Sequence, residues 1–406
     1  MRVEARWPKA DAVVGNPPFV GDKKMRGELG DVYTEALRAA SKGRVPGGAD
    51  LVCYWFEKAR AQIEAGALQR AGFVATQAIR AGSNRECLQR VLNTTRIYDA
   101  WADQPWINEG AAVRVSMVCF GASVQSSRLD GADVARIGAD LSASDNDLTT
   151  AAAIATNQRV AFQGPVKVGA FDIAGSVARS WLGLPNPHGR SNADVLRPWA
   201  NGRDLTARPS DTWIVDFGTD MRGEAASLYE APYAHVLAQV KPMRDAQARE
   251  SRKKWWWLHG ETVPGLRRCL DGLSRYVATV RVAKHRLFVW LPVQTWPDSR
   301  LYVFSRQDDT TLGLLSSRVH EVWALANASR HGVGNDPTYN AKSCFETFPF
   351  PAGLTPADTA HQRTEALDDG ALIPADLPPA MREHAAAIAR AATNARRDWP
   401  RGCPHA

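Results

Sequence analysis

The sequence predicts an N-terminal α/β domain, an α+β domain after it and a helical tail, from three observations. Short apolar segments alternate with stretches of helical periodicity over residues 1–125. Residues 181–351 are a Trp-, Arg- and Pro-rich mixture, and residues 352–406 are rich in Ala, Pro and acidic side chains. Between the two domains, residues 126–180 show weak periodicity and runs of Ser, Ala, Asp and Thr, so we expect a linker there.

In the N-terminal domain, strands and helices are expected to alternate. The spacing of Leu51, Trp55 and Ala59 predicts a helix over residues 50–65. The other expected elements are strands at residues 11–15, 72–76, 97–101 and 111–120 and a helix at residues 84–92. Short strands separated by helices indicate a largely parallel sheet with helices on both faces.

Beyond residue 180 the pattern predicts a few further elements. Alternating β-branched and basic residues indicate strands on a charged surface within residues 276–291. Residues 312–329 have the spacing of an amphipathic helix, and a last helix is expected over residues 379–397. The chain has no internal repeat with a period of about 20 to 50 residues, which argues against a solenoid or a propeller.

Composition indicates a soluble globular protein. The chain has 406 residues, of which 45% are hydrophobic and 23% charged, ordinary values for this class. It contains no apolar run of the roughly 18 to 20 residues that span a membrane, and its first residues lack the apolar core of a signal peptide. A cytoplasmic location is therefore expected. The six cysteines are scattered without a Cys-x-x-Cys pair, so neither a disulfide framework nor a metal site is predicted.

Positive charge is concentrated in one part of the sequence. The whole chain has a formal net charge of +7. Residues 241–286 alone contain twelve Lys or Arg against four Asp or Glu, an excess of +8, so the remainder is close to neutral. A concentrated basic segment is expected of a protein that binds the phosphate backbone of a nucleic acid.

The Asn-Pro-Pro-Phe loop, residues Asn16-Pro17-Pro18-Phe19, has the residue types that an amino-methyltransferase needs. The exocyclic amine of a base is a poor nucleophile because its lone pair is delocalised into the ring. Two hydrogen-bond acceptors can localise this lone pair by holding both N–H bonds out of the ring plane. The side-chain oxygen of Asn16 and the carbonyl of Pro17 can be these acceptors, and Pro17 and Pro18 preorganise the backbone. Phe19 offers an aromatic face to a base flipped out of its duplex.

The alternative interpretation of this loop is an ordinary turn, because Asn-Pro initiates turns. Its position favours the catalytic interpretation. The loop directly follows the apolar residues Ala12–Val14, which are expected to be a strand. This places it at the carboxyl end of a sheet strand, where α/β folds bind their ligands.

Several blocks of the sequence resemble class I adenine-specific DNA methyltransferases of the gamma order. The resemblance is greatest to the modification part of type IIL (MmeI-like) restriction–modification enzymes. The matching blocks are residues 11–19, 49–59, 71–77 and 110–118. The target-recognition region of that family is echoed by residues 196–199, 201–204, 317–323, 339–340 and 347–351. Together these blocks cover roughly residues 8–351.

The resemblance implies a fold, an activity and site residues. Residues 1–125 match the C-terminal half of a Rossmann-like methyltransferase domain, and residues 181–351 match a DNA target-recognition domain. Asn16 and Pro17 match the pair that binds the target amine, and Phe19 matches the stacking residue. Asp50 and Leu51 match the start of the helix beside the methionine end of S-adenosylmethionine. The implied reaction is methyl transfer from S-adenosylmethionine to adenine N6 in duplex DNA.

One part of the family pattern is missing from this sequence. In the family, a strand, a glycine-rich turn and an acidic ribose ligand precede the Asn-Pro-Pro-Phe loop, but only fifteen residues precede Asn16 here. The turn Gly332-Val333-Gly334 does not follow a strand pattern and is a weak substitute. We therefore expect the catalytic domain to be truncated at its N-terminal side. The main cofactor-binding segment is expected on a separate polypeptide, and the family's nuclease segment is not found in this chain.

The residues expected to contact DNA lie in the second domain. Arg pairs with guanine and Asn with adenine, so Asn192, Arg197, Asn201 and Arg203 are candidates for contacting base edges. Cations of the basic segment are candidates for contacting phosphates: Arg249, Arg252, Lys253, Lys254, Arg267 and Arg268. The neighbouring Trp255-Trp256-Trp257 is interpreted as part of a core, with stacking on a distorted duplex as the alternative.

Three alternative functions remain open from the sequence. The same loop serves amino-methyltransferases that act on cytosine N4, on RNA or on a glutamine side chain. The chain also fits a non-catalytic DNA-binding remnant, or the specificity subunit of a split restriction–modification system. A complete restriction–modification enzyme is disfavoured because the nuclease segment is missing from this sequence.

Overall fold

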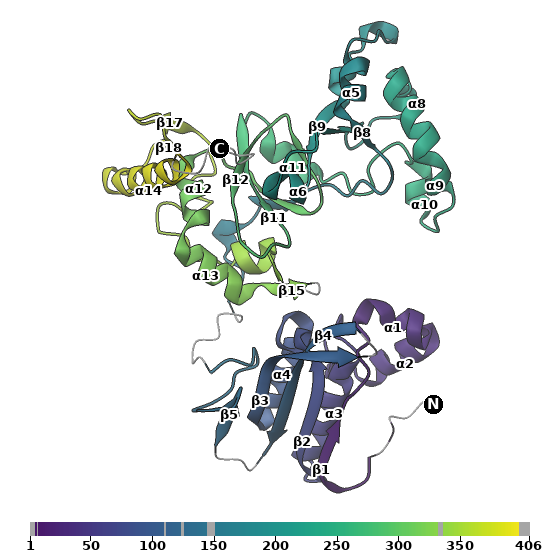
Figure 1. Ribbon diagram of the computed structural model, residues 1–406, viewed down its shortest axis with the longest axis vertical. Helices are drawn as coiled ribbons and strands as arrows, with labels where there is room; N and C mark the ends of the chain where they lie inside the picture. The colour runs from purple at the N-terminus through teal and green to yellow at the C-terminus, as the bar shows by residue number, and fades with distance from the viewer. Residues whose placement is uncertain are drawn as a thin grey trace. The chain divides into compact units, whose positions relative to one another are not determined.

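The computed structural model describes residue 5 and residues 7–108, 111–122, 126–143, 151–331 and 336–397. The chain divides into two compact units, each with its own hydrophobic core (Figure 1). The first unit comprises Met1–Ala151 and Ala328–Asp336, and the second comprises Ala152–Asn327 and Pro337–Ala406. Among the described residues, no helix combines the length and apolar character needed to cross a membrane.

A six-stranded sheet in the order β1-β2-β4-β3-β5-β6 forms the first unit. Its strands are β1 (Ala10–Gly15), β2 (Leu68–Thr76), β3 (Arg96–Asn108), β4 (Ala111–Gly121), β5 (Ser127–Leu129) and β6 (Ala132–Val134). The pairs β1/β2 and β3/β5 are parallel, whereas β2/β4, β3/β4 and β5/β6 are antiparallel. The expectation of a largely parallel sheet is therefore only partly right, because β4 lies antiparallel between β2 and β3.

The direction of β4 follows from a short connection. Only residues 109 and 110 separate β3 from β4 in the sequence. A connection this short joins antiparallel neighbours, whereas parallel strands need a crossover of about a dozen residues or more. The two strands therefore form one long hairpin, in which β4 also pairs with β2.

Two helices, α3 (Val52–Glu64) and α4 (Gly82–Thr94), pack against each other and share one core with the sheet. Phe56 of α3 contacts Phe73 of β2 and Phe120 of β4, with ring centroids 5.1 and 5.7 Å apart. Helices α3 and α4 lie on the same face of the sheet, although helices were expected on both faces. The strands β1, β2 and β3 follow one another in one direction across the sheet, and right-handed crossovers then place both helices on the same face.

Two shorter helices, α1 (Asp22–Leu29) and α2 (Asp31–Ala40), follow the Asn-Pro-Pro-Phe loop. They are held together by the buried Thr34, whose hydroxyl donates to the carbonyl of Met25 at 3.2 Å. A single 3-10 turn, Gln77–Arg80, connects β2 to α4. Successive strand residues point to opposite faces of a sheet. Val14 lies on the face away from α3 and is 86% exposed.

Two four-stranded sheets form the framework of the second unit, in the orders β13-β9-β10-β8 and β12-β11-β14-β7. The strands are β7 (Ala161–Gln163), β8 (Asp172–Ala174), β9 (Leu196–Ala200), β10 (Thr212–Val215), β11 (Arg275–Val280), β12 (Val289–Pro292), β13 (Trp296–Pro297) and β14 (Leu301–Phe304). The strands expected within residues 276–291 are β11 and β12, which pair antiparallel. Of the three tryptophans expected in a core, Trp256 is 8% exposed in the core of this unit and Trp257 packs against it, whereas Trp255 is 39% exposed.

Short helices connect and cover these strands. They are α5 (Gly175–Leu182), α6 (Gly202–Thr206), α7 (Gly223–Ala226), α8 (Glu230–Gln239), α9 (Lys241–Asp245), α10 (Glu250–Lys254), α11 (Pro264–Leu270), α12 (Asp309–Ser316) and α13 (Arg318–Asn327). The single helix expected over residues 312–329 is two helices, because Ser317 between them has extended backbone at φ −67° and ψ 151°. Strands β15 (Ser329–His331) and β16 (Asp336–Thr338) pair after α13.

Residues 126–180 are not a linker, in contrast to the expectation from their composition. Strands β5 and β6 extend the sheet of the first unit. Strands β7 and β8 and helix α5 belong to the second unit, where β7 pairs with β14 and β8 with β10. Strands of three residues are too short to show a periodicity, so the sequence pattern missed them. Residues 144–150, part of the predicted Ser- and Thr-rich run, lie outside the described residues.

The predicted tail also packs onto the second unit over its described part. Strands β17 (Thr364–Ala366) and β18 (Leu372–Pro374) pair, and α14 (Pro379–Arg397) follows with the predicted bounds. Ala385 and Ala389 of α14 are buried in a small core with Leu314 of α12. Gly313 of α12 allows this close approach, because a β-carbon there would lie 2.6 Å from a methyl group of Ile388. The predicted turn at residues 332–334 and Cys403 lie outside the described residues.

Candidate active site and nucleic-acid interface

The Asn-Pro-Pro-Phe loop begins directly after Gly15, at the carboxyl end of β1. β1 pairs in parallel with β2, with Gly15 opposite Phe73. The loop therefore stands at the sheet edge where α/β folds bind ligands, as the sequence predicts.

Exposure differs along the loop. Asn16 and Pro18 are exposed, Pro17 is buried and Phe19 is half-buried. The chain turns tightly after Pro18, whose carbonyl accepts a hydrogen bond of 2.9 Å from the backbone N–H of Val20. An amine could therefore reach the side chain of Asn16, while the buried Pro17 anchors the loop on the sheet.

The exit of the loop is held by the buried Asn84 and the partly buried Asp50, a pair that we call the Asp50–Asn84 clamp. Asn84 donates from its amide to the Asp50 carboxylate, and its oxygen accepts from the backbone N–H of Asp50, both at 2.7 Å. The other carboxylate oxygen of Asp50 accepts from the backbone N–H of Asp22 at 3.0 Å. The N–H of Leu51 donates to the carbonyl of Val20 at 2.9 Å. The first residues of α1 and α3 are thus tied together just behind the loop.

Asp50 and Leu51, which the sequence predicts to bind the cofactor, are both held by contacts within the protein. Both carboxylate oxygens of Asp50 already accept hydrogen bonds within the protein. Leu51 is 3% exposed. Leu51 therefore offers no polar group from its side chain, and the partly buried Asp50 carboxylate is already used to hold the helix starts.

A second contact supports the same helices. Arg38 of α2 pairs with Asp22 of α1 at 2.6 Å. Tyr54 of α3 lies beside this pair, and burial raises the pKa of its phenol against the opposing effect of Arg38. The phenol therefore stays protonated over the physiological range and can act as a donor.

Sequence reasoning missed Asn84, which is 7% exposed. It lies in the first turn of α4, where an Asn is commonly interpreted as a cap. A usable signal was present, because Asn84 is in helical register with the buried Leu88 and Val91. A polar residue at a core-facing position needs a hydrogen-bond partner, and here the partner is Asp50.

Some residues expected to contact DNA are already engaged within the second unit. Arg267 forms two hydrogen bonds of 2.8 Å with the buried Asp216 and lies 4.5 Å from the ring centroid of Trp296. Burial opposes ionisation of Asp216, but the charges of His259 and Arg267 keep its pKa below the ordinary value. The guanidinium of Arg197 also lies over the Trp296 ring, 5.8 Å from its centroid. These contacts assign Arg267 a structural role whether or not it also meets DNA.

Other predicted DNA-contacting residues cap or flank helices. Asn201 accepts from the backbone N–H of Arg203 at 2.8 Å and forms a capping box with Asp204 at the start of α6. Lys253 pairs with Glu250 within α10 at 2.7 Å. Of the other predicted residues, Arg203, Arg249, Lys254 and Arg268 are exposed, and Arg252 is partly buried.

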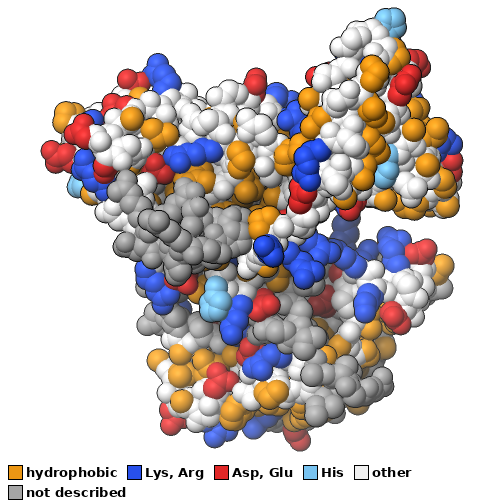
Figure 2. Space-filling view, turned by 45° about the horizontal axis from the view of Figure 1, so that its top comes forward, with side chains coloured by type: hydrophobic (Ala, Val, Ile, Leu, Met, Phe, Trp, Pro, Cys, Tyr) orange, Lys and Arg blue, Asp and Glu red, His pale blue; other side chains and the backbone are white. Residues whose placement is uncertain are grey.

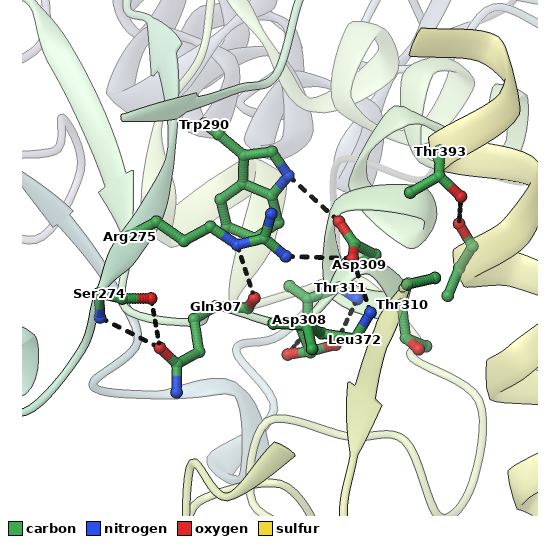
Figure 3. A network of polar contacts seen from close by, with 12 residues as sticks. Ser274, Arg275, Trp290, Gln307, Asp308, Asp309, Thr310, Thr311, Leu372 and Thr393 are labelled. Atoms are coloured by element: carbon green, nitrogen blue, oxygen red, sulfur yellow. Dashed lines mark hydrogen bonds and ion pairs between the residues drawn. The ribbon is translucent and has the colours of Figure 1, made fainter. Parts of the chain in front are cut away.

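Arg275, counted in the basic segment, belongs to a structural network (Figure 3). Its guanidinium lies 3.0 Å from the carboxylate of Asp309 and 3.9 Å from the ring centroid of Trp290. Asp309 also accepts from the indole N–H of Trp290 at 3.3 Å and from the backbone N–H of Leu372 at 2.8 Å. This network joins β11, β12, α12 and β18, so the charge of Arg275 holds elements together.

Two further arginines of the basic segment are interior. Arg244 is 1% exposed and donates to the carbonyls of Val168, Lys167 and Leu258. Burial lowers the pKa of Arg286, which stands over the ring of Tyr339 at 5.1 Å. Only part of the local charge excess is therefore available to a partner. Figure 2 shows Lys and Arg side chains among the residues exposed on the face in view.

Comparison with known families concerns the first unit. Residues 4–130 match the family described as MmeI, DNA-methyltransferase domain. The match includes the Asn-Pro-Pro-Phe loop, the Asp50–Asn84 clamp and the sheet that carries them. This match covers 127 of the 406 residues. A comparison with curated proteins found no match.

The fold around the methyltransferase domain also resembles solved structures. The type IIL restriction-modification enzyme MmeI in complex with DNA is 17% identical over 97% of this chain and 50% of that chain, with a TM-score of 0.73. The type IIG restriction endonuclease BpuSI is 11% identical over 94% of this chain and 49% of that chain, with a TM-score of 0.29. A DrdV–DNA complex is 9% identical over 84% of this chain and 43% of that chain, with a TM-score of 0.36. Both TM-scores are too low to show a shared fold. The chain thus spans half the length of the MmeI chain and shares its fold over that span.

The family match places the Asn-Pro-Pro-Phe loop inside the methyltransferase domain, in agreement with the sequence-based expectation of a DNA methyltransferase. The match ends at residue 130, near the end of β5. The second unit, with its exposed cations and engaged arginines, lies outside it.

Proposed function

We propose that this chain, together with a cofactor-binding segment on a separate polypeptide, is a site-specific DNA methyltransferase with adenine N6 as the methyl acceptor. The observation that carries this proposal is the exposed Asn16 in a loop at the carboxyl end of β1, within an MmeI-type methyltransferase domain. Asn16 and the carbonyl of Pro17 would accept the two N–H bonds of the target amine and so localise its lone pair. Phe19 would stack on the flipped base.

The methyl donor in this proposal is S-adenosylmethionine, which supplies the methyl group when bound. Asp50 and Leu51 are proposed to lie beside its methionine end. Because their polar groups are engaged within the clamp or buried, we propose that most cofactor contacts come from residues outside this pair. A separate polypeptide remains the proposed source of the main cofactor-binding segment.

The partner is proposed to be double-stranded DNA, bound by the second unit, with residues 181–351 as the target-recognition region. Support comes from the exposed cations on this unit. The proposed contacts to phosphates or bases come from the exposed Arg203, Arg249, Lys254 and Arg268 and from the partly buried Arg252, Arg197, Asn201, Lys253 and Arg267. An electrostatic partner of this kind predicts binding that weakens steeply as salt rises.

The test is methylation by the protein purified with any partner that accompanies it, using radiolabelled S-adenosylmethionine and duplex DNA. We expect Asn16→Ala to reduce the rate by about a hundredfold or more, because removing one preorganised polar contact to a transition state commonly costs this much. The matched control is Asn93→Ala, an exposed position on α4, which should methylate at the wild-type rate. Equal methylation by Asn16→Ala and wild type would rule out the assigned role of the loop.

The product separates this proposal from its alternatives. Digestion of the methylated DNA should yield N6-methyl-2′-deoxyadenosine, whereas N4-methyl-2′-deoxycytidine would assign the same loop to cytosine. Methylation of RNA or of a protein glutamine in place of DNA would reject the proposed substrate. Salt-sensitive DNA binding without any S-adenosylmethionine binding in calorimetry, alone or with its partner, would favour a non-catalytic specificity subunit.

A further inference from the structure

A cavity of about 280 Å³ lies in the second unit, lined by the turn after β10 and by α10 with the residues that follow it. Its walls include Thr219, Ser251, Arg252, Trp255 and His259. This volume is close to the lower end of the roughly 300–1,000 Å³ typical of small-molecule sites. No role assigned above to the methyltransferase domain uses this cavity.

The walls of the cavity are rigidly built. The buried Asp216 accepts from the backbone N–H of Gly218 at 3.1 Å, which fixes the turn that carries Thr219. His259 is 5% exposed, is held by a hydrogen bond of 3.0 Å to the carbonyl of Val215, and packs edge-on against a neighbouring aromatic ring. A cavity with fixed walls can select a ligand by shape as well as by charge.

Two guanidinium groups give the cavity its positive character. Arg244 and Arg252 both line it. The hydrogen bonds of Arg244 go to backbone carbonyls, which carry no full negative charge. The Nε atom of Arg252 is buried without a hydrogen-bond partner among the described residues. The single carboxylate in the lining is Asp220, which is exposed and accepts from the hydroxyl of Thr219 at 3.2 Å.

Two guanidinium groups that line one cavity favour an anionic ligand there. A buried polar group without a partner costs free energy unless a ligand or water satisfies it. The pKa of Arg244 is lowered to about 10, by burial and then by the charge of Arg252, which agrees with this geometry. An oxyanion in the cavity would lie beside both guanidinium groups and reduce their repulsion.

We propose that this cavity binds a phosphate group, with Arg252 as its principal ligand and the Ser251 hydroxyl as a second donor. Guanidinium matches phosphate geometry with two parallel hydrogen bonds. Trp255, 39% exposed at the mouth, offers an apolar surface to an attached sugar or base. The phosphate could belong to duplex DNA, in which case the site rests on the proposed function, or to a free nucleotide.

Calorimetric titration of the full chain with inorganic phosphate tests the site. Wild type should bind saturably, and Arg252→Met should weaken binding about tenfold or more, the loss expected for a charge-assisted hydrogen bond. Arg252→Lys should retain part of the binding. The control is Arg318→Met, an exposed arginine on α13 outside the cavity, which should bind like wild type. Absent binding by wild type, equal binding by Arg252→Met, or equally good binding of acetate would each overturn the proposal.

Folding and ligand source are separated by two further measurements. Thermal unfolding of each variant identifies misfolding, and in that case Ser251→Ala, which removes only the second donor, decides by the same titration. With duplex DNA, the slope of log affinity against log salt should fall by about 0.9 in Arg252→Met if a DNA phosphate occupies the site. An unchanged slope with phosphate binding lost identifies a free nucleotide. Failure of the wild-type chain to bind DNA would reject the proposed function. The titration with inorganic phosphate would still test the cavity independently.

Discussion

At the scale of single residues, the Asp50–Asn84 clamp connects the candidate catalytic loop to the core. Asn84 uses both ends of its amide on Asp50, and Asp50 in turn holds the backbone of Asp22. Each bond is short and largely removed from water, so leaving one group unpaired costs about 1 to 3 kcal/mol. The position of the loop therefore depends on a pair that does not itself face the target base.

Exchanging the two residues tests the clamp. Asn84→Asp alone places two carboxylates together and should lower the free energy of unfolding of the first unit by about 1 to 3 kcal/mol. The double variant Asp50→Asn/Asn84→Asp re-forms the reciprocal pair with the roles reversed, and should recover at least half of the loss. Hydrogen–deuterium exchange of the peptide containing Asp22 is the local readout. Fast exchange in the double variant, equal to that of Asn84→Asp, would show that the clamp does not act through this pair.

At the scale of elements, α12 and α14 touch through a glycine. A β-carbon at Gly313 would lie 2.6 Å from a methyl group of Ile388 and 2.9 Å from its carbonyl oxygen. The hydroxyl of Thr310 donates to the carbonyl of Ala385 at 3.1 Å across the same contact. The two helices therefore approach more closely than larger side chains would permit.

Gly313→Ala should separate these helices. In an open helix, Gly→Ala stabilises by roughly 0.5 to 1 kcal/mol, but overpacking costs about 1 to 3 kcal/mol, so a net loss is expected. Urea unfolding of the second unit measures it. Gly27→Ala is the matched control, because Gly27 of α1 has open space around its missing β-carbon and should stabilise the first unit. A stability gain for both variants would contradict the close packing of α12 and α14.

At the scale of the whole molecule, the sequence predicted the first unit better than the second. The Asn-Pro-Pro-Phe loop and α3 could be located because each combines a specific residue pattern with a strong periodicity. The same-face placement of α3 and α4 could not, since it depends on the order of strands across the sheet. In the second unit, Arg244, Arg267 and Arg275 look alike in sequence, and only tertiary contacts distinguish interior arginines from exposed ones.

The pH dependence of stability is also a property of the folded unit. His320 is fully buried; its Nδ1–H donates to the carbonyl of Leu315 at 2.8 Å and its Nε2 accepts from the hydroxyl of Tyr339 at 3.1 Å. Burial lowers its pKa to about 4 from the ordinary value of 6.5, with a smaller contribution from the charge of Arg286. No carboxylate is among its hydrogen-bond partners in the described part of the chain, so the native state favours the neutral imidazole.

The second unit should therefore lose stability as pH falls from about 6.5 to about 4, since the unfolded chain takes up a proton in this range that the native chain resists. Above the upper limit the contribution is fully present, and by the lower limit about 3 kcal/mol is lost. Urea unfolding at several pH values measures the loss, and His320→Asn should remove it, because Asn can still donate to Leu315 but does not titrate. His384→Asn, on the exposed side of α14, should leave the wild-type profile in place. A profile for His320→Asn that falls as steeply as that of wild type would assign the acid sensitivity to other groups.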